Sequence, residues 1–254
     1  MSEIAELHRL AGQAVAAVFD GPDVEIRRTA GGTFAFSGEL VTDLNMLVLA
    51  SPSSPAVKRL LEESVARVEA RGLPMLAMAP PDVAETLAPD AARLALDVAG
   101  SLPLMVLRGA PTRKPGPATC RIDAVSDADG ARVVVPLVSA AFELPADAIS
   151  RAFGGMFAPT SGAANFVAYA DGAPQSSVTV TRTGATAGVW NMATPPERQG
   201  KGMGRALLTG VLEQLSADGV ERFYLFATAA GRPLYESLGF ETLADAVVWV
   251  KGAH

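Results

Sequence analysis

Glycines and basic residues alternate in one short segment of this chain, residues 198–205. Gly200, Gly202 and Gly204 allow the backbone of this segment to turn tightly. A helix is expected to begin within it, so the amides from Gly200 to Arg205 would lie at the positive end of a helix dipole. Backbone amides in that arrangement hold phosphate groups. The segment therefore predicts a pyrophosphate site.

Three cations strengthen this interpretation. Arg198, Lys201 and Arg205 lie within eight residues of a chain whose net charge is −6, so the local charge favours a polyanionic ligand. The alternative is a solvated glycine loop whose charges are there by chance. Two better-known phosphate loops do not fit. A dinucleotide fingerprint needs G-x-G-x-x-G after the first strand of a parallel unit, and a Walker A loop needs Ser or Thr where Gly202 follows Lys201.

The chain has few residues for catalysis or metal binding by histidine or cysteine: one cysteine and two histidines. The single cysteine, Cys120, cannot form an internal disulfide or a cysteine-rich metal cage, and we expect it to pack at the start of a strand. The two histidines, His8 and His254, lie near the two ends of the chain. A Ser-His-Asp triad or a multi-histidine zinc site is therefore not expected, and no metal is predicted.

The elements expected around the glycine segment form a mixed sheet with helices on its faces, an α/β fold in which most strands are antiparallel. Strands are expected at 119–125, 165–169, 175–183, 186–193, 223–227 and 247–250. Helices are expected at 127–142 (with Asp127 as its N-cap), 146–153, 203–215 and 229–238. The three middle strands form an antiparallel meander, because Asp171-Gly172 and Thr183-Gly184 are turn signals.

The first part of the chain repeats this order more weakly. We expect strands at 24–29, 33–36, 45–50, 75–79 and 104–107, with a hairpin around Gly31-Gly32, and helices at 57–68 and 83–98, the second interrupted at Pro89. Prolines and glycines cluster between the two parts without apolar periodicity, which is typical of a linker. The predicted domains are 1–110 and 118–254, joined by a linker at 111–117.

Two motifs resemble the GNAT superfamily of N-acetyltransferases. Gln199-Gly200-Lys201-Gly202-Met203-Gly204 is similar to its Arg/Gln-x-x-Gly-x-Gly/Ala loop, and the segment from Leu234 to Phe240 looks like its Leu-Tyr-x-x-x-Gly-Phe ending. The resemblance covers 118–254, with 1–110 as a degenerate copy, so the expected fold is two tandem GNAT-like units. It implies that acetyl-CoA lies in a V-shaped opening between strands 186–193 and 223–227.

The resemblance also implies which residues hold the cofactor. The acetyl and pantetheine groups would pair with the backbone of Met192, Ala193 and Thr194, and the pyrophosphate with the amides of the loop. Thr228 stands where many members have Asn, and it shares the expected wall with Gly231. The cofactor-binding candidates are Met192, Ala193, Thr194, Gln199, Gly200, Lys201, Gly202, Met203, Gly204, Arg205, Thr228 and Gly231.

Tyr235 is the candidate catalytic residue. Attack of an amine on a thioester expels a thiolate, and a phenol at the sulfur could donate a proton to it. The alternative is that Tyr235 only packs on the inner face of its helix. Where many relatives place a glutamate base on the fourth strand, this chain has Trp190 and Asn191. A water chain, Glu143 or the terminal carboxylate of His254 stays open as the base.

The expected function is acetyl-CoA-dependent N-acetylation of a small amine, an amino-acid derivative or a peptide. The alternative is a regulatory module that binds acetyl-CoA without turnover. Segment 139–160 is expected to select the acceptor in an apolar pocket with some acidic character. The first domain is expected to bind no cofactor, because Pro52 and Pro55 remove amides from its corresponding loop, and instead to brace the second domain or form part of the substrate cleft. The net charge argues against nucleic acid, and no apolar run suggests a membrane partner or a signal peptide, so we expect a cytoplasmic protein. A homodimer stays open.

Overall fold

Antiparallel strands form most of the C-terminal half of the chain, as the sequence predicts. The computed structural model describes residues 1–50, 55–112 and 120–253. Strand β6 pairs with β7, β7 with β8, and β8 with β9, all antiparallel, which confirms the predicted meander. The elements of this half are β6 (Arg121–Val125), α4 (Asp127–Phe142), α5 (Ala146–Phe153), η2 (Gly154–Phe157), β7 (Ala163–Ala170), β8 (Ala173–Thr183), β9 (Thr186–Ala193), η3 (Pro196–Arg198), α6 (Met203–Ala217), β10 (Arg222–Phe226), α7 (Arg232–Ser237) and β11 (Glu241–Lys251).

The N-terminal half has a similar order of elements. Its hairpin, three further strands and two later helices agree with the prediction, and a helix that contains His8 precedes them. These elements are α1 (Glu3–Val18), β1 (Glu25–Thr29), β2 (Gly32–Phe36), η1 (Thr42–Leu44), β3 (Asn45–Leu49), α2 (Pro55–Glu69), β4 (Met75–Ala79), α3 (Pro81–Arg93) and β5 (Asp97–Arg108).

Two predicted helix boundaries were wrong. Helix α3 continues through Pro89, where an interruption was expected. It ends at Arg93 and not at 98, because Ala95 adopts a left-handed φ of 53° and the chain then enters β5. Helix α4 has Ser126 as its N-cap, and the expected cap Asp127 has a φ of 57°. Glycine is the usual left-handed residue at helix ends, so an alanine and an aspartate in this conformation gave no signal in the sequence.

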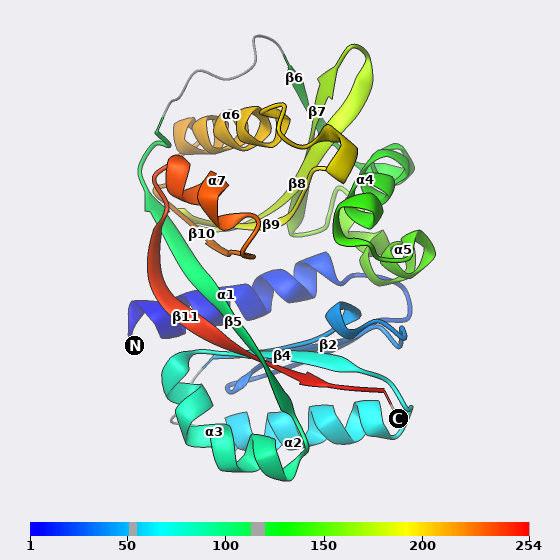
Figure 1. Cartoon of the computed structure of the whole chain (residues 1–254), viewed down its shortest axis with the longest axis vertical. Helices are drawn as coiled ribbons and strands as arrows, with labels where there is room; N and C mark the ends of the chain where they lie inside the picture. The colour runs from blue at the N-terminus through cyan, green and yellow to red at the C-terminus, as the bar shows by residue number, and fades with distance from the viewer. Residues whose placement is uncertain (51–54, 113–119, 254) are drawn as a thin grey trace.

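The described strands join in one 11-stranded sheet with the order β1-β2-β3-β4-β11-β5-β10-β9-β8-β7-β6. The last strand of each half crosses to the other half. Strand β5 pairs with β10, and β11 pairs with both β4 and β5, all antiparallel (Figure 1). The boundary at 111–117 stays a prediction for the chain, since most of it lies outside the described residues. The sheet itself does not divide there.

Helix α1 lies between the two halves (Figure 1). It packs on β2 and β3 of the N-terminal half and on β7, β8 and β9 of the C-terminal half. Its first turn is anchored by ion pairs, in which Glu3 pairs with Arg108 at 2.7 Å and with Arg222 at 3.3 Å. The N-terminal half therefore braces the C-terminal sheet, one of the two roles predicted for it.

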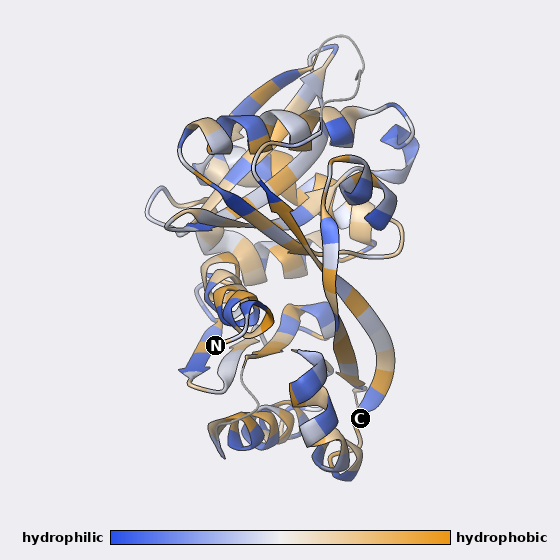
Figure 2. Ribbon diagram, turned by 90° about the vertical axis from the view of Figure 1, so that its left-hand side faces the viewer, coloured by the Kyte–Doolittle hydropathy of each residue, from blue (hydrophilic) through white to orange (hydrophobic). Residues whose placement is uncertain are grey.

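Separate cores cover the outer faces of the sheet. In the C-terminal half, Leu207 and Val211 of α6 pack with Phe223 and Leu225 of β10. In the N-terminal half, α2 and α3 cover a cluster that also includes Trp249 of β11. Figure 2 shows β11, the strand that ends at the C-terminus, passing between the halves with hydrophobic residues along it. Burial of this strand in the other half's core links the two halves.

Candidate active site

Strands β9 and β10 separate from each other at the centre of the C-terminal half. They pair in parallel over three positions only, from Arg222↔Thr186 to Tyr224↔Gly188. Beyond that point β9 continues to pair with β8, as far as Ala193↔Ser177, and β10 with β5. The backbone edges that face each other across the opening are therefore free to bind a ligand. This is the V-shaped opening that the sequence predicts.

A bulge in β9 contributes to the separation. Ser177 pairs with Ala193 and Thr179 with Trp190, so β9 holds one residue more than β8 between these pairs. Asn191 lies in the bulge with a φ of 46°. Its Nδ2 is buried and has no hydrogen-bond partner within the described part of the chain. The bulge therefore presents a free amide donor, which the sequence analysis missed.

The carboxyl end of β9 lies directly against the start of α6. The buried hydroxyl of Ser176 donates to the carbonyl of Ala193 at 2.7 Å and lies 2.8 Å from the Thr194 hydroxyl. A Cβ atom on Gly204 would lie 2.9 Å from Thr194 Oγ1 and 3.1 Å from Met192 Cε. Glycine at 204 thus allows the helix to approach the strand, a packing role that adds to the predicted approach to phosphate.

The glycine loop has the backbone conformation that its composition predicts. Gly200 and Gly202 have left-handed φ values of 75° and 76°, and Gly202 is the N-cap of α6. No side chain caps this helix. The amides of its first turn, Met203 to Arg205, lack intrahelical acceptors, because the first turn of any helix does. They are available to an anion at the mouth of the opening.

The three predicted cations are placed differently from one another. Arg198 donates to the carbonyl of Pro174, and Arg205 donates to the Ser237 hydroxyl at 2.6 Å. Lys201 is exposed and donates to the carbonyl of Glu197 at 3.2 Å. Gln199 donates to the carbonyl of Thr194 at 3.0 Å and closes the loop. All three cations stay near the loop. Arg198 and Arg205 also link it to neighbouring elements through these hydrogen bonds.

Tyr235 lies on α7 and is 8% exposed. It belongs to the same core cluster as Val189 of β9 and Leu225 of β10, the strands that border the opening, and its ring meets Phe240 edge to face at 6.0 Å. Burial raises the pKa of Tyr235 to about 12. Its hydroxyl therefore keeps its proton at neutral pH, as a proton donor must.

Thr228 and Gly231 position this tyrosine. The Thr228 hydroxyl accepts a hydrogen bond from the Gly231 amide at 3.2 Å, just before α7. A Cβ atom on Gly231 would lie 3.0 Å from Tyr235 Cε2, so a larger residue would displace the ring. The Arg205 to Ser237 contact also ties the start of α6 to α7. Residues predicted to contact the cofactor thus also hold the candidate acid.

Of the base candidates, only Glu143 lies among the residues that the structure describes. Glu143 is exposed at the end of α4, and His254 lies outside the described residues. Trp190 donates to the Thr181 hydroxyl at 3.0 Å and packs on Tyr224 and Phe226, on the face of the sheet that α1 covers.

Segment 139–160 mainly joins the two halves. Phe153 meets Phe19 of the N-terminal half edge to face at 4.8 Å, and Arg151 pairs with both Asp147 and Glu39. These ion pairs offset the acidic character that the sequence suggested. A cavity of about 220 Å³ lies between the end of β6 and the start of β7, and Met156 and Phe157 line it. The expected apolar pocket is thus present in part.

Within residues 1–50, 55–112 and 120–253, no three His, Cys, Asp or Glu side chains gather closely enough to hold a metal ion. None of the helices in these ranges combines the length and the apolar character that crossing a bilayer requires.

Comparison with known proteins agrees with the fold and the loop. Residues 161–242, which include the opening, the glycine loop and Tyr235, match the acetyltransferase (GNAT) domain family. No curated protein sequence matches the chain. Among solved structures, a GCN5-related N-acetyltransferase from Kribbella flavida is similar with a TM-score of 0.70 and 17% identity, over 99% of this chain and 96% of that one.

Two further structures are similar over nearly the full length. A tandem GNAT protein from the clavulanic acid biosynthesis pathway has a TM-score of 0.61 and 16% identity, and the match covers 98% of this chain and 94% of that one. A GNAT-family acetyltransferase structure from Novosphingobium aromaticivorans has a TM-score of 0.57 and 19% identity, covering 98% and 96%. At these identities the likeness concerns the fold. Residues 161–242 match the GNAT acetyltransferase domain family, and the whole chain has the fold of the tandem GNAT structures.

Proposed function

We propose that this protein transfers the acetyl group of acetyl-CoA to a primary amine of a small molecule, an amino-acid derivative or a peptide. The observation that carries the proposal is the opening between β9 and β10 beside the uncapped start of α6. Free strand edges suit the amides of a pantetheine arm, and the free amides of a helix start suit a pyrophosphate. The match to the GNAT domain family suggests acetyl-CoA as the donor, since this cofactor carries both a pantetheine arm and a pyrophosphate.

In this proposal each residue has a defined task. Backbone groups of Met192, Ala193 and Thr194 orient the thioester, and the buried Nδ2 of Asn191 supplies one more donor near it. The acceptor nitrogen attacks the carbonyl carbon, and the carbon–sulfur bond breaks. Tyr235 donates its proton to the departing thiolate. Water or a group on the acceptor side removes the ammonium proton.

A thiol-release assay with acetyl-CoA tests the transfer. Primary amines, amino acids and peptide N-termini are offered in turn, with the acetylated product identified by mass spectrometry. Product formation that requires both acetyl-CoA and enzyme supports the proposal. Binding of acetyl-CoA without turnover on any amine would favour the second candidate, a regulatory module, which the absence of a carboxylate base in the described site also favours.

A further inference from the structure

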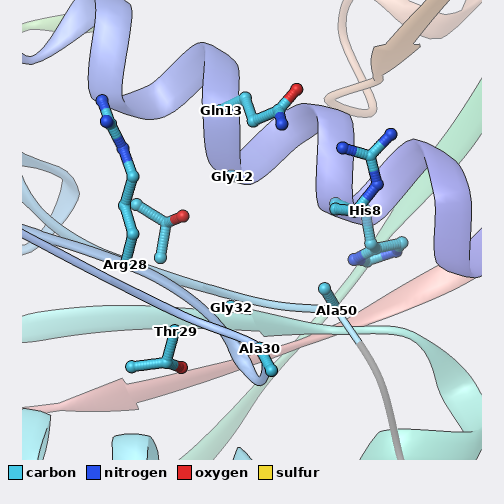
Figure 3. A pocket seen from close by; sticks show the side chains of 10 residues that line it. His8, Gly12, Gln13, Arg28, Thr29, Ala30, Gly32 and Ala50 are labelled. Atoms are coloured by element: carbon cyan, nitrogen blue, oxygen red, sulfur yellow. The ribbon is translucent and has the colours of Figure 1, made fainter.

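A cavity of about 240 Å³ lies in the N-terminal half, between α1 and the turn that joins β1 to β2 (Figure 3). None of its wall residues belongs to the proposed acetyl-CoA site. Its polar wall residues come from α1, the end of β1 and the start of β2. They are His8, Arg9, Gln13, Arg28, Thr29 and Thr33.

The cavity lies beside the end of β3. Strands β3 and β4 pair in parallel from Met46↔Leu76 to Val48↔Met78, and each strand has one residue beyond the last pair. Ala50, directly after β3, lines the cavity. The cavity therefore lies near the ends of two parallel strands, on the side of the sheet that α1 covers.

His8 is the buried polar group of this cavity. It has no exposed surface, and its Nδ1 lies 3.2 Å from the carbonyl oxygen of Leu49. Burial lowers the pKa of His8 to about 4, so the ring is neutral near pH 7. Nδ1 must then carry the proton and donate to Leu49, which leaves a lone pair on Nε2. Nε2 is buried and has no partner within the described part of the chain, so it requires a donor.

Two arginines supply positive charge. Arg28 is exposed and makes no hydrogen bond or ion pair with any described residue, whereas Arg27, one position before it, pairs with Glu63. Arg9 is exposed too, and it interacts electrostatically with Glu6. Figure 3 shows Arg28 and His8 at opposite ends of the cavity, with Gln13 above the space between them. Unpaired guanidinium groups favour a carboxylate, which they can bind through two parallel hydrogen bonds.

We propose that this cavity binds a small carboxylate that carries an amine or hydroxyl group at its other end. Arg28 holds the carboxylate at one end of the cavity, and the amine or hydroxyl donates to Nε2 of His8 at the other end. The volume of about 240 Å³ lies below the ~300–1,000 Å³ of pockets for drug-sized ligands, so the ligand is a short amino or hydroxy acid. The inference does not depend on acetyl transfer, and acetyl-CoA is left out of its test.

The probes are ω-amino acids from glycine to 6-aminohexanoate and the hydroxy acids of the same lengths, titrated into the full chain at pH 7 by calorimetry. For the tightest probe, the matched fatty acid lacks the donor and the matched alkylamine lacks the carboxylate. We expect at least one probe to bind with a Kd below about 10 mM, and both matched compounds to bind at least about tenfold more weakly.

Variants assign the site. Arg28→Gln should weaken the binding of the tightest probe at least about tenfold, whereas Arg71→Gln, an exposed arginine outside the cavity wall, should leave its affinity unchanged. His8→Phe should remove the preference for the probe over the matched fatty acid. Since His8 is buried, circular dichroism checks that the His8→Phe variant is folded. If it is unfolded, the result for Arg28→Gln alone tests whether the cavity is the binding site. The proposal is overturned if no probe binds, if the matched compounds bind equally well, or if Arg28→Gln binds like the wild type.

Discussion

A buried phenol that keeps its proton suits a departing thiolate, and Tyr235 meets that description. Tyr235→Phe keeps the ring and its contact with Phe240 but removes the donor. We expect the Kd for acetyl-CoA to change less than about tenfold, while kcat falls by roughly 10²–10⁴-fold. Calorimetry gives the Kd, and the thiol-release assay on an identified acceptor gives kcat. A kcat within about threefold of the wild type would mean that the thiolate leaves without this proton.

His8 makes the stability of the protein depend on pH. Burial lowers its pKa from 6.5 to about 4, whereas the unfolded chain keeps the higher value. The unfolded state therefore binds more protons between these pH values, and acidification favours unfolding. The free energy of unfolding should lose up to about 3 kcal/mol from this residue as pH falls from about 7 to 4.

Urea unfolding of the wild type and His8→Gln across that range measures this contribution. The difference in unfolding free energy between the two proteins should narrow as pH falls, because the variant lacks the titrating ring. A constant difference at all pH values would show that His8 has an ordinary pKa in the folded protein.

Individual residues were predictable to different degrees. Gly202 and Tyr235 belong to local motifs that resemble those of the GNAT superfamily, and this resemblance suggested their roles. The bulge at Asn191 depends on how β9 is paired with β8, and a single asparagine in a strand does not reveal that register. Ser176 lies in a different strand from the residues that it contacts, so no local pattern linked it to the loop.

Among the elements, the loop before α6 allows the clearest test of cofactor binding. Gly202 and Gly184 both have left-handed φ values, 76° and 59°, so a valine costs each position roughly 1–2 kcal/mol of backbone strain. Only Gly202 lies at the start of α6; Gly184 is in the turn between β8 and β9. Gly202→Val should weaken acetyl-CoA binding at least about tenfold, and Gly184→Val should leave it unchanged.

Thermal unfolding first confirms that both variants are folded, with similar melting temperatures. Calorimetry then compares their Kd values for acetyl-CoA. Equal affinity of the two variants for acetyl-CoA would show that the glycine loop is only a solvated turn and does not bind the cofactor.

Elements with strong periodicity were predicted well. Strand β9 was predicted with its observed bounds, Thr186–Ala193, because turn signals flank it, and α6 was predicted within two residues of its observed end. Strand β11 was predicted only in its apolar part, 247–250, because its first half, Glu241–Asp245, mixes polar and apolar residues. The missed end of α3 depends on Ala95, as described above.

At the scale of the whole molecule, the exchange of β5 and β11 makes the two halves interdependent. Trp190 lies in the C-terminal half, whereas Trp249 of β11 is buried in the core of the N-terminal half. In Trp249→Phe the remaining tryptophan, Trp190, reports on the C-terminal half. In Trp190→Phe the remaining tryptophan, Trp249, reports on the core of the N-terminal half. Each variant should unfold in urea in one transition that its fluorescence and its far-UV circular dichroism report with the same midpoint. Fluorescence and circular dichroism midpoints that separate in either variant would show that the halves unfold independently.

This exchange could not be predicted from the sequence. Strand pairing between β4 and β11 joins residues more than 160 positions apart, and neither strand carries a pattern that specifies its neighbour. The sequence indicated two similar units, and their pairing into one sheet is a property of the folded molecule.

Calorimetric titration of the full chain with acetyl-CoA tests the central claim most directly. One cofactor is expected in the opening between β9 and β10, whereas the N-terminal cavity is proposed to bind a small carboxylate. The prediction that the first domain binds no cofactor was based on loop residues of which 51–54 lie outside the described part, so stoichiometry must decide it. We expect one acetyl-CoA per chain. Two sites per chain, or none, would contradict the account.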